Sequence, residues 1–285
     1  MTDATTHERD FMNSIVFIGG GNMAGALIGG LIGRGVAAAR IRVLEIEPTR
    51  RAQLSEQFGV DTLAAPDASL RDAETVILAV KPQQLRQVCA ELRPHLAAPL
   101  VLSIAAGIRA ADIARWLAQP RVVRAMPNTP ALIGLGISGA AALAAASSED
   151  RQRAQTLLEA VGPVVWFDDE ALLDPVTAVS GSGPAYVFYF IEALQRAGTE
   201  LGLPPAQARA LAIATFRGAS ELAARSEDSL ATLRERVTSK GGTTAAALAS
   251  MQADRIGDGI AAAVRAASLR ATEMGDEFGR DQGTD

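Results

Sequence analysis

The chain has 285 residues, of which 48% are hydrophobic, and it carries a formal charge of −5 at pH 7. This length exceeds what one average domain needs, so we expect two domains. The negative charge and an aromatic content of only 4% argue against a nucleic-acid-binding protein, because phosphate backbones are bound through clustered positive charge.

The first segment, residues 1–12, contains acidic side chains and no apolar stretch, so we expect a disordered tail and neither a secretory signal nor a membrane anchor. Further along, no apolar stretch has the length that a bilayer span requires. Cys89 is the single cysteine. It therefore predicts no internal disulfide, and without neighbouring Cys or His ligands it predicts no metal site. We expect a cytoplasmic protein without a membrane partner.

Short β-branched runs alternate with amphipathic stretches in the first half of the chain. The runs fall at residues 14–18, 41–45, 75–80, 100–104, 121–125 and 163–167. This alternation is typical of βαβ units, so we expect an α/β domain with a mainly parallel, doubly wound sheet between two layers of helices. Gly35 and Gly59 stand where helices should end, and Pro82 stands where one should begin.

The first predicted strand leads directly into a glycine-rich turn that contains the pattern G-x-G-x-x-A. In this pattern Gly19 allows the tight turn, Gly21 lets the backbone approach a pyrophosphate, and Ala24 lets helix and strand pack closely. The free N–H groups of the helix start favour phosphate binding. We therefore predict a dinucleotide-binding Rossmann-like domain over residues 13–168. Its predicted cofactor-binding residues begin with Gly19, Gly21, Asn22, Met23 and Ala24.

The residues after the second strand give opposite indications about the coenzyme. An acid such as Glu45 hydrogen-bonds the ribose hydroxyls of NAD, whereas arginines such as Arg50 and Arg51 accommodate the 2′-phosphate of NADP. The sequence thus predicts NADH or NADPH without choosing between them. Two later strand ends should line the nicotinamide half, since open α/β sheets bind ligands at the carboxyl ends of their strands. The remaining predicted cofactor-binding residues are Glu45 after the second strand, and Ala79, Val80, Lys81, Pro82, Ala105 and Ala106 at these two strand ends.

Beyond the last run, alanine- and leucine-rich stretches begin at Ala185, Pro205, Leu230, Thr244 and Ile256. They predict an all-helical second domain over residues 169–275, followed by a frayed tail at 276–285. Alanines around residues 261–267 permit close helix approach, and a bundle this rich in alanine buries little area per residue. We therefore expect a homodimer, with a monomeric bundle as the alternative.

Side chains for acid–base catalysis are scarce. The histidines are His7 in the tail and His95 in a polar loop, and the lysines are Lys81 and Lys240. A dehydrogenase that acts on an alcohol needs a positioned base such as His or Lys. A protonated cyclic imine already carries the charge that makes its carbon electrophilic, so its reduction demands positioning more than proton transfer. The composition favours reduction of C=N over C=O, with water or Tyr186 as alternative proton carriers.

The segment 237–245 places hydroxyls and glycines before an alanine-rich helix. Thr238 or Ser239 should cap this helix, and three successive N–H groups should cradle an anion such as a carboxylate. A plain helix cap is the alternative. The three donors are the N–H groups of Gly242, Thr243 and Thr244. A second cluster at 180–184 places Pro184 in a first helical turn and should present another helix start.

Six motifs together resemble the pyrroline-5-carboxylate reductase family in order and spacing. They are residues 19–25, 79–82, 103–107, 124–130, 179–186 and 237–244, within a resemblance that extends from about residue 14 to about residue 274. The resemblance implies that NAD(P)H reduces (S)-1-pyrroline-5-carboxylate to L-proline in the last step of proline biosynthesis. It also implies a Rossmann-like N-terminal domain, a helical dimerisation domain, and dimers that assemble into larger rings, commonly decamers.

The resemblance also assigns roles within the 237–244 motif. By motif position, Thr244 is the catalytic residue that hydrogen-bonds the ring nitrogen. The substrate carboxylate is held by Ser239, Gly242 and Thr243. Lys240 stands where many members have proline, which bears on the stiffness of this loop, and Glu45 is less usual for a member that prefers NADPH. Two other functions stay open: an imine or ketone reductase with another substrate, and a non-catalytic dinucleotide-sensing dimer.

Overall fold

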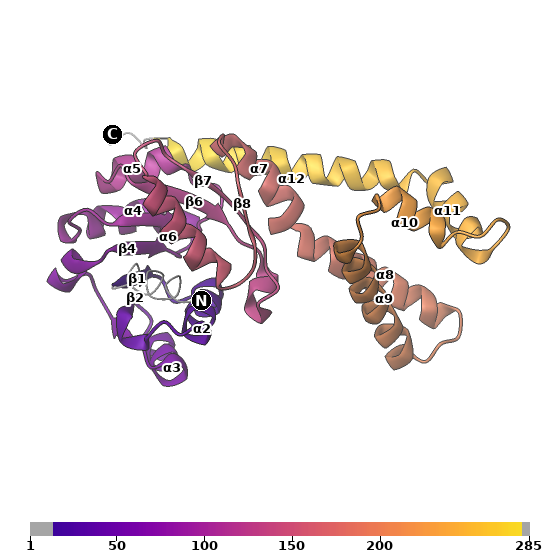
Figure 1. Ribbon diagram of the computed structural model, residues 1–285, viewed down its shortest axis with the longest axis horizontal. Helices are drawn as coiled ribbons and strands as arrows, with labels where there is room; N and C mark the ends of the chain where they lie inside the picture. Colours follow the sequence, from indigo (N-terminus) through magenta and orange to yellow (C-terminus); the bar gives the residue numbers. More distant parts are fainter. Residues whose placement is uncertain (1–13, 281–285) are drawn as a thin grey trace, which may run out of the picture. The chain divides into compact units, whose positions relative to one another are not determined.

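A computed structural model describes residues 14–280. They form two compact units, shown in Figure 1. The sheet unit comprises residues 14–182 and 267–280, and the helical unit comprises Gly183–Ala266. The tail expected at residues 1–12 lies outside the described residues.

The sheet unit is built on one eight-stranded sheet with the order β3-β2-β1-β4-β5-β6-β7-β8. Its central strand β1 pairs in parallel with both β2 and β4, and Ile15 lies opposite Ile41 and Thr75. Among the described strands, β6 and β7 form the one antiparallel pair. The strands are β1 Ile15–Ile18, β2 Ile41–Leu44, β3 Asp61–Leu63, β4 Thr75–Leu78, β5 Leu100–Ser103, β6 Val122–Met126, β7 Ser138–Ala142 and β8 Val164–Trp166.

Helices cover both faces of this sheet. They are α2 Asn22–Gly33, α3 Pro48–Phe58, α4 Pro82–Leu92, α5 Ala110–Leu117 and α6 Ser148–Glu159. Along β1, Ile15 and Phe17 pack into the core under α2, α3 and α6, whereas Val16 and Ile18 pack into the core under α4 and α5. Both faces of the strand are buried, as a parallel sheet requires. The predicted doubly wound fold is confirmed.

Two strands were not predicted from the sequence. β7 reads Ser-Gly-Ala-Ala-Ala and lacks β-branched residues, so its propensity for strand is low. It forms because its backbone pairs with β6 on one side and β8 on the other. β3 has only three residues and lies at the edge of the sheet beside β2. In both cases long-range pairing decides the structure.

The chain after β8 is helical, which confirms the predicted helical C-terminal region. Its elements are η5 Glu170–Leu172, α7 Leu173–Val176, η6 Thr177–Gly181, α8 Gly183–Glu200, α9 Pro205–Arg225, α10 Leu230–Arg236, α11 Thr243–Ala253 and α12 Ile256–Gly279. Within the helical unit α8 packs against α9, with Gly198 against Ala208 at the contact. Among the described helices, none combines the length and the hydrophobicity of a membrane span.

The expected frayed tail from residue 276 is wrong as far as Gly279, because α12 continues to that residue. Asp276 forms an ion pair with Arg109, and Glu277 accepts a hydrogen bond from Arg270 at 2.7 Å. Met274 packs against Gly107, which has no side chain to obstruct it. The contacts of Asp276 and Met274 hold the last turns of α12 against the rest of the sheet unit, and the Arg270–Glu277 bond lies within the helix.

Candidate functional site

The glycine-rich turn after β1 has the geometry that a pyrophosphate site requires. Gly19 adopts φ +95°, and a Cβ there would lie 2.9 Å from the main-chain oxygen of Ala79, so only glycine fits. Gly21 caps α2 at φ −64°, and a Cβ there would meet no atom within 4 Å. No side chain caps α2, so its first N–H groups have no side-chain partner. Ala24 is fully buried where helix and sheet pack.

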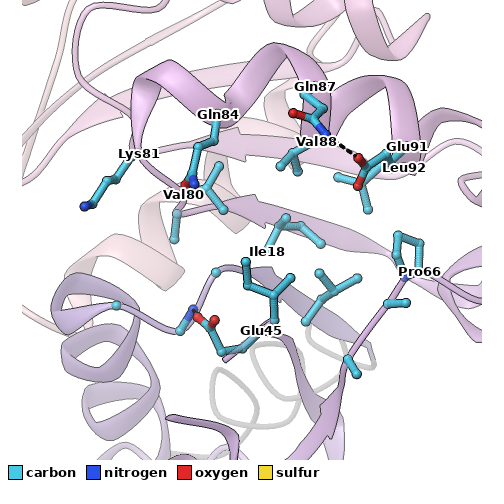
Figure 2. A pocket seen from close by; sticks show the side chains of 18 residues that line it. Ile18, Glu45, Pro66, Val80, Lys81, Gln84, Gln87, Val88, Glu91 and Leu92 are labelled. Atoms are coloured by element: carbon cyan, nitrogen blue, oxygen red, sulfur yellow. Dashed lines mark hydrogen bonds between the residues drawn. The ribbon is translucent and has the colours of Figure 1, made fainter. Parts of the chain in front are cut away.

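A cavity of about 470 Å³ opens at the carboxyl ends of β1, β2 and β4. Figure 2 shows Glu45 on one side of this cavity and the side chains of α4 on the other, with Ile18 between them. This volume lies within the usual range for cofactor sites. Six of the predicted cofactor-binding residues line the cavity: Gly19, Gly21, Glu45, Ala79, Val80 and Lys81. The open helix start and the cavity together fit a dinucleotide.

The other predicted cofactor-binding residues lie outside the wall of this cavity. Asn22 begins α2 and is exposed, while Met23 packs against the core. Pro82 begins α4, as predicted for a proline at a helix start. Ala105 follows β5, and its N–H donates to the Ser103 hydroxyl at 3.3 Å. The remaining two are Ala24, which is buried, and Ala106, which is partly buried.

Glu45 makes contacts that the sequence did not reveal. Its Oε2 accepts a hydrogen bond from the Gly20 N–H at 2.8 Å, and its Oε1 accepts one from the Glu47 N–H at 2.9 Å. Arg51 donates from Nη1 to the main-chain oxygen of Glu45 at 2.8 Å, and Arg50 donates from Nε to that of Gly20 at 2.6 Å. The acid therefore holds the glycine turn, and the two arginines brace the surrounding backbone.

Titratable groups elsewhere in the sheet unit supply little catalytic chemistry. Burial raises the pKa of the Cys89 thiol to about 12, so this cysteine stays protonated and is a poor nucleophile. His95 ends the short helix η3 Arg93–His95 and does not line the cavity. His7 lies outside the described residues. Hydrogen bonding from Thr49, followed by the N–H of Arg50, lowers the pKa of Glu47, which is therefore ionised at neutral pH.

The start of α11 differs in one respect from the prediction. Its N-cap is Gly242, without a side-chain hydrogen bond, so the expectation that Thr238 or Ser239 caps the helix is wrong. The Thr238 hydroxyl instead donates back to the main-chain oxygen of Arg234 at 2.6 Å. Gly241, at φ +73°, turns the chain between these residues and the helix.

This turn nevertheless places the predicted substrate-binding residues in one short segment. The Ser239 hydroxyl lies against Gly242, in the space that a Cβ would need. The N–H of Gly242 donates to the main-chain oxygen of Ser239 at 3.0 Å, so one of the three expected anion donors already has a partner. Thr243 and Thr244 begin α11, where N–H groups have no partner within the helix. The N–H groups and the hydroxyls of Thr243 and Thr244 are therefore available there.

The helix start expected at residues 180–184 is confirmed, because α8 begins at Gly183 with Pro184 in its first turn. The residues before it also form helices, α7 and η6. The Ser182 N–H donates to the main-chain oxygen of Thr177 at 2.8 Å, which makes one wide turn in the helix. Pro184 has no N–H, so the carbonyl of Ser180 is left for another donor. Asn128 Nδ2 donates a hydrogen bond to this carbonyl at 3.2 Å.

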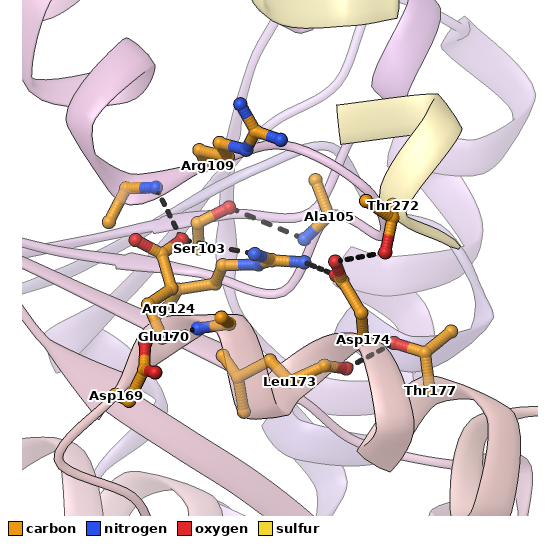
Figure 3. A network of polar contacts seen from close by, with 12 residues as sticks. Ser103, Ala105, Arg109, Arg124, Asp169, Glu170, Leu173, Asp174, Thr177 and Thr272 are labelled. Atoms are coloured by element: carbon orange, nitrogen blue, oxygen red, sulfur yellow. Dashed lines mark hydrogen bonds and ion pairs between the residues drawn. The ribbon is translucent and has the colours of Figure 1, made fainter. Parts of the chain in front are cut away.

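Arg124 is the centre of a polar network that sequence reasoning missed (Figure 3). It lies on β6 with only 4% of its side chain exposed, and it pairs with Glu170 at 3.0 Å and Asp174 at 3.5 Å. Glu170 also accepts from the Ala110 N–H at 2.7 Å, and Asp174 from the Thr272 hydroxyl at 3.0 Å. A charged residue inside an apolar strand was the available signal, since buried charges need partners.

Comparisons with known proteins point to one family. Residues 170–274 match the family model for pyrroline-5-carboxylate reductase dimerisation, and residues 14–107 match that for the NADP oxidoreductase, coenzyme F420-dependent. The pyrroline-5-carboxylate reductase of Pseudomonas aeruginosa is 47% identical over 268 residues, covering 93% of this chain and 98% of that protein.

Solved structures agree with this result. The pyrroline-5-carboxylate reductase of Coxiella burnetii matches with a TM-score of 0.86 at 38% identity, covering 92% of this chain and 98% of that one. The Plasmodium falciparum pyrroline carboxylate reductase with NADP bound matches with a TM-score of 0.81 at 26% identity and the same coverage, 92% and 98%. The similarity therefore spans both units of the chain.

Proposed function

Because this chain belongs to the pyrroline-5-carboxylate reductase family, we propose that it reduces (S)-1-pyrroline-5-carboxylate to L-proline with NADPH or NADH. This is the last step of proline biosynthesis. One observation carries the proposal: 47% identity over 93% of the chain to a protein of that name. The family resemblance inferred from six sequence motifs is confirmed.

We propose that residues 13–168 act as the dinucleotide-binding domain. The open N-terminus of α2 supports a pyrophosphate at Gly21, since helix N–H groups and the helix dipole favour an anion there. Glu45 faces the ribose end, and the strand ends at Ala79 and Ala105 face the nicotinamide half. When bound, the reduced nicotinamide supplies the hydride.

Residues 169–275 act in this proposal as the substrate and dimerisation domain. At the start of α11 the N–H groups and hydroxyls provide neutral donors for a carboxylate, so Ser239, Gly242 and Thr243 hold that group once the Gly242 N–H leaves the main-chain oxygen of Ser239. The Thr244 hydroxyl hydrogen-bonds the ring nitrogen and orients the imine carbon. The imine is already protonated and the product amine keeps that proton, so these residues position the substrate and need not transfer a proton.

The chain forms a homo-oligomer. The dimerisation family model matches residues 170–274, and the described helical unit buries only Ala208 and Ala212. Large apolar side chains such as Phe188 and Tyr189 are 67% and 70% exposed in the single chain, and association would cover them. We propose a dimer that assembles into a larger ring such as a decamer, located in the cytoplasm. Light scattering of the purified protein measures the number of subunits.

A comparison of substrates tests the proposed activity. Steady-state kcat/KM is measured for pyrroline-5-carboxylate, a six-membered cyclic imine and an acyclic imine, each with NADPH and NADH. We expect the five-membered ring to react fastest. Faster turnover of another imine or of a ketone would identify that compound as the substrate in place of pyrroline-5-carboxylate. A complete lack of coenzyme oxidation would favour a dinucleotide-sensing dimer.

A further inference from the structure

We propose that Glu45 makes this chain select NADH over NADPH. Glu45 directly follows β2 and lines the cavity beside the glycine turn, where the adenosine ribose of a dinucleotide lies in this fold (Figure 2). The inference deepens the proposed function, because it names the coenzyme of the same site.

The Glu45 carboxylate is already oriented for a ribose. Hydrogen bonds from the Gly20 N–H at 2.8 Å and the Glu47 N–H at 2.9 Å each occupy one position on a different oxygen. A carboxylate offers about four acceptor positions, so roughly two remain. The 2′- and 3′-hydroxyls of NADH are donors that match them. Because the side chain is held before the coenzyme arrives, little conformational entropy is lost on binding.

A 2′-phosphate meets the opposite situation. It would place a dianion against the Glu45 carboxylate, which lines the cavity. A fully ionised phosphate also has no hydrogen to donate to this carboxylate. Juxtaposed like charges of this kind disfavour the wrong partner strongly. The phosphate therefore gains nothing from the group that binds the ribose of NADH.

The arginines nearby contact the backbone of the turn with part of their donors. Arg51 donates from Nη1 to the main-chain oxygens of Glu45 and Ile46, at 2.8 Å and 2.9 Å. Arg50 donates from Nε to the main-chain oxygen of Gly20 at 2.6 Å and from Nη1 to Gln53 at 3.2 Å. These bonds hold the turn between β2 and α3 and fix both guanidinium groups against its backbone, which leaves a phosphate only their remaining N–H groups. The arginines therefore stabilise the backbone that presents Glu45.

The test uses Glu45→Gln with Glu47→Gln as its matched control. Both variants remove one negative charge with little change in size, but only Glu45 lines the cavity. Dissociation constants for NADH and NADPH are measured by calorimetry without any imine, and kcat/KM is measured with pyrroline-5-carboxylate. We expect the unmodified chain to favour NADH by roughly tenfold or more. Glu45→Gln should reduce that preference about tenfold, and Glu47→Gln should change it less than about twofold.

Two results would overturn the inference: a preference of the unmodified chain for NADPH, or equal effects of the two variants on the preference. Arg51→Ala provides a further check, because a selective loss of NADPH binding would assign the 2′-phosphate to Arg51. We expect this variant to affect both coenzymes alike. If NADH binds more tightly than NADPH but pyrroline-5-carboxylate is not reduced, the proposed function fails and the coenzyme selection stands.

Discussion

Arg124 Nη1 lies 3.0 Å from Glu170 Oε1 in the interior of the sheet unit, and Arg124 Nη2 lies 3.5 Å from Asp174. Removal of the guanidinium would leave two carboxylates without their shared counter-charge. We expect Arg124→Ala to lower the free energy of unfolding by about 3 kcal/mol or more. Urea denaturation at one fixed protein concentration measures the loss, since oligomer stability depends on concentration.

Arg270 provides the control for this prediction. It also pairs with two carboxylates, those of Glu273 and Glu277, but 55% of its side chain is exposed. Arg270→Ala should cost less than about 1 kcal/mol, because water screens and replaces exposed ion pairs. Similar losses in the two variants would mean that burial does not set the strength of the Arg124 network.

Gly19 and Gly21 should respond differently to alanine. At Gly19 the positive φ and the nearby Ala79 oxygen strain any side chain, so Gly19→Ala should destabilise the fold by roughly 1–3 kcal/mol. At Gly21 the backbone suits any residue and the space is open, so Gly21→Ala should change stability by less than about 0.5 kcal/mol. Its methyl group would obstruct the pyrophosphate and raise the coenzyme dissociation constant on the order of tenfold.

Thermal unfolding and a coenzyme titration of both variants measure these effects. A Gly21→Ala variant that binds coenzyme as tightly as the unmodified chain would remove this turn from the pyrophosphate site.

Local patterns explain why the glycine turn was predictable. The positive φ of Gly19 arises in the turn between one strand and the helix that follows it in sequence, so G-x-G-x-x-A carries that information. The Ala79 oxygen, which also excludes a side chain there, comes from a distant part of the chain. The six β-branched runs likewise have a high intrinsic propensity for strand, and each of them forms a strand in the structure. β7 carried no such signal, because its small residues become a strand only through pairing with β6 and β8.

Long-range contacts explain what sequence reasoning missed at the site. Glu45 was expected to contact a ribose, but nothing local indicates that its carboxylate also holds the Gly20 N–H, which is 25 residues away in sequence. Asn128 and Ser180 are 52 residues apart, and their hydrogen bond depends on the fold. The start of α11 was found because its hydroxyls and glycines are contiguous, although the capping residue was predicted wrongly.

Thr244→Ala should lower kcat with pyrroline-5-carboxylate on the order of tenfold or more, because the variant lacks the hydroxyl proposed to orient the reacting nitrogen. Ser250→Ala, further along α11, is the control and should leave kcat unchanged. Circular dichroism establishes that both variants are folded. Normal turnover by folded Thr244→Ala would exclude a role for this hydroxyl.

Asp150 should make part of the stability depend on pH. Burial tends to raise its pKa, but hydrogen bonds from Arg121 and Ser147 outweigh burial and hold the pKa below the ordinary 3.8. The ionised carboxylate therefore stabilises the fold above that value, and the contribution is lost as the pH falls through the folded-state pKa. Asp150→Asn should lower the free energy of unfolding at pH 7 by about 2 kcal/mol.

Denaturation curves from pH 7 down to below the ordinary pKa of 3.8 test this prediction. The difference between the variant and the unmodified chain should shrink as the pH falls. A difference that stays constant across this range would assign the loss to packing and not to charge.

Oxidation of NADH or NADPH by the purified chain in the presence of pyrroline-5-carboxylate tests the central claim most directly. Absorbance of the reduced coenzyme is followed while the product is identified by chromatography. We expect one L-proline for each coenzyme oxidised, and no oxidation without the imine. A folded, oligomeric chain that binds the coenzyme but forms no proline would contradict the assignment.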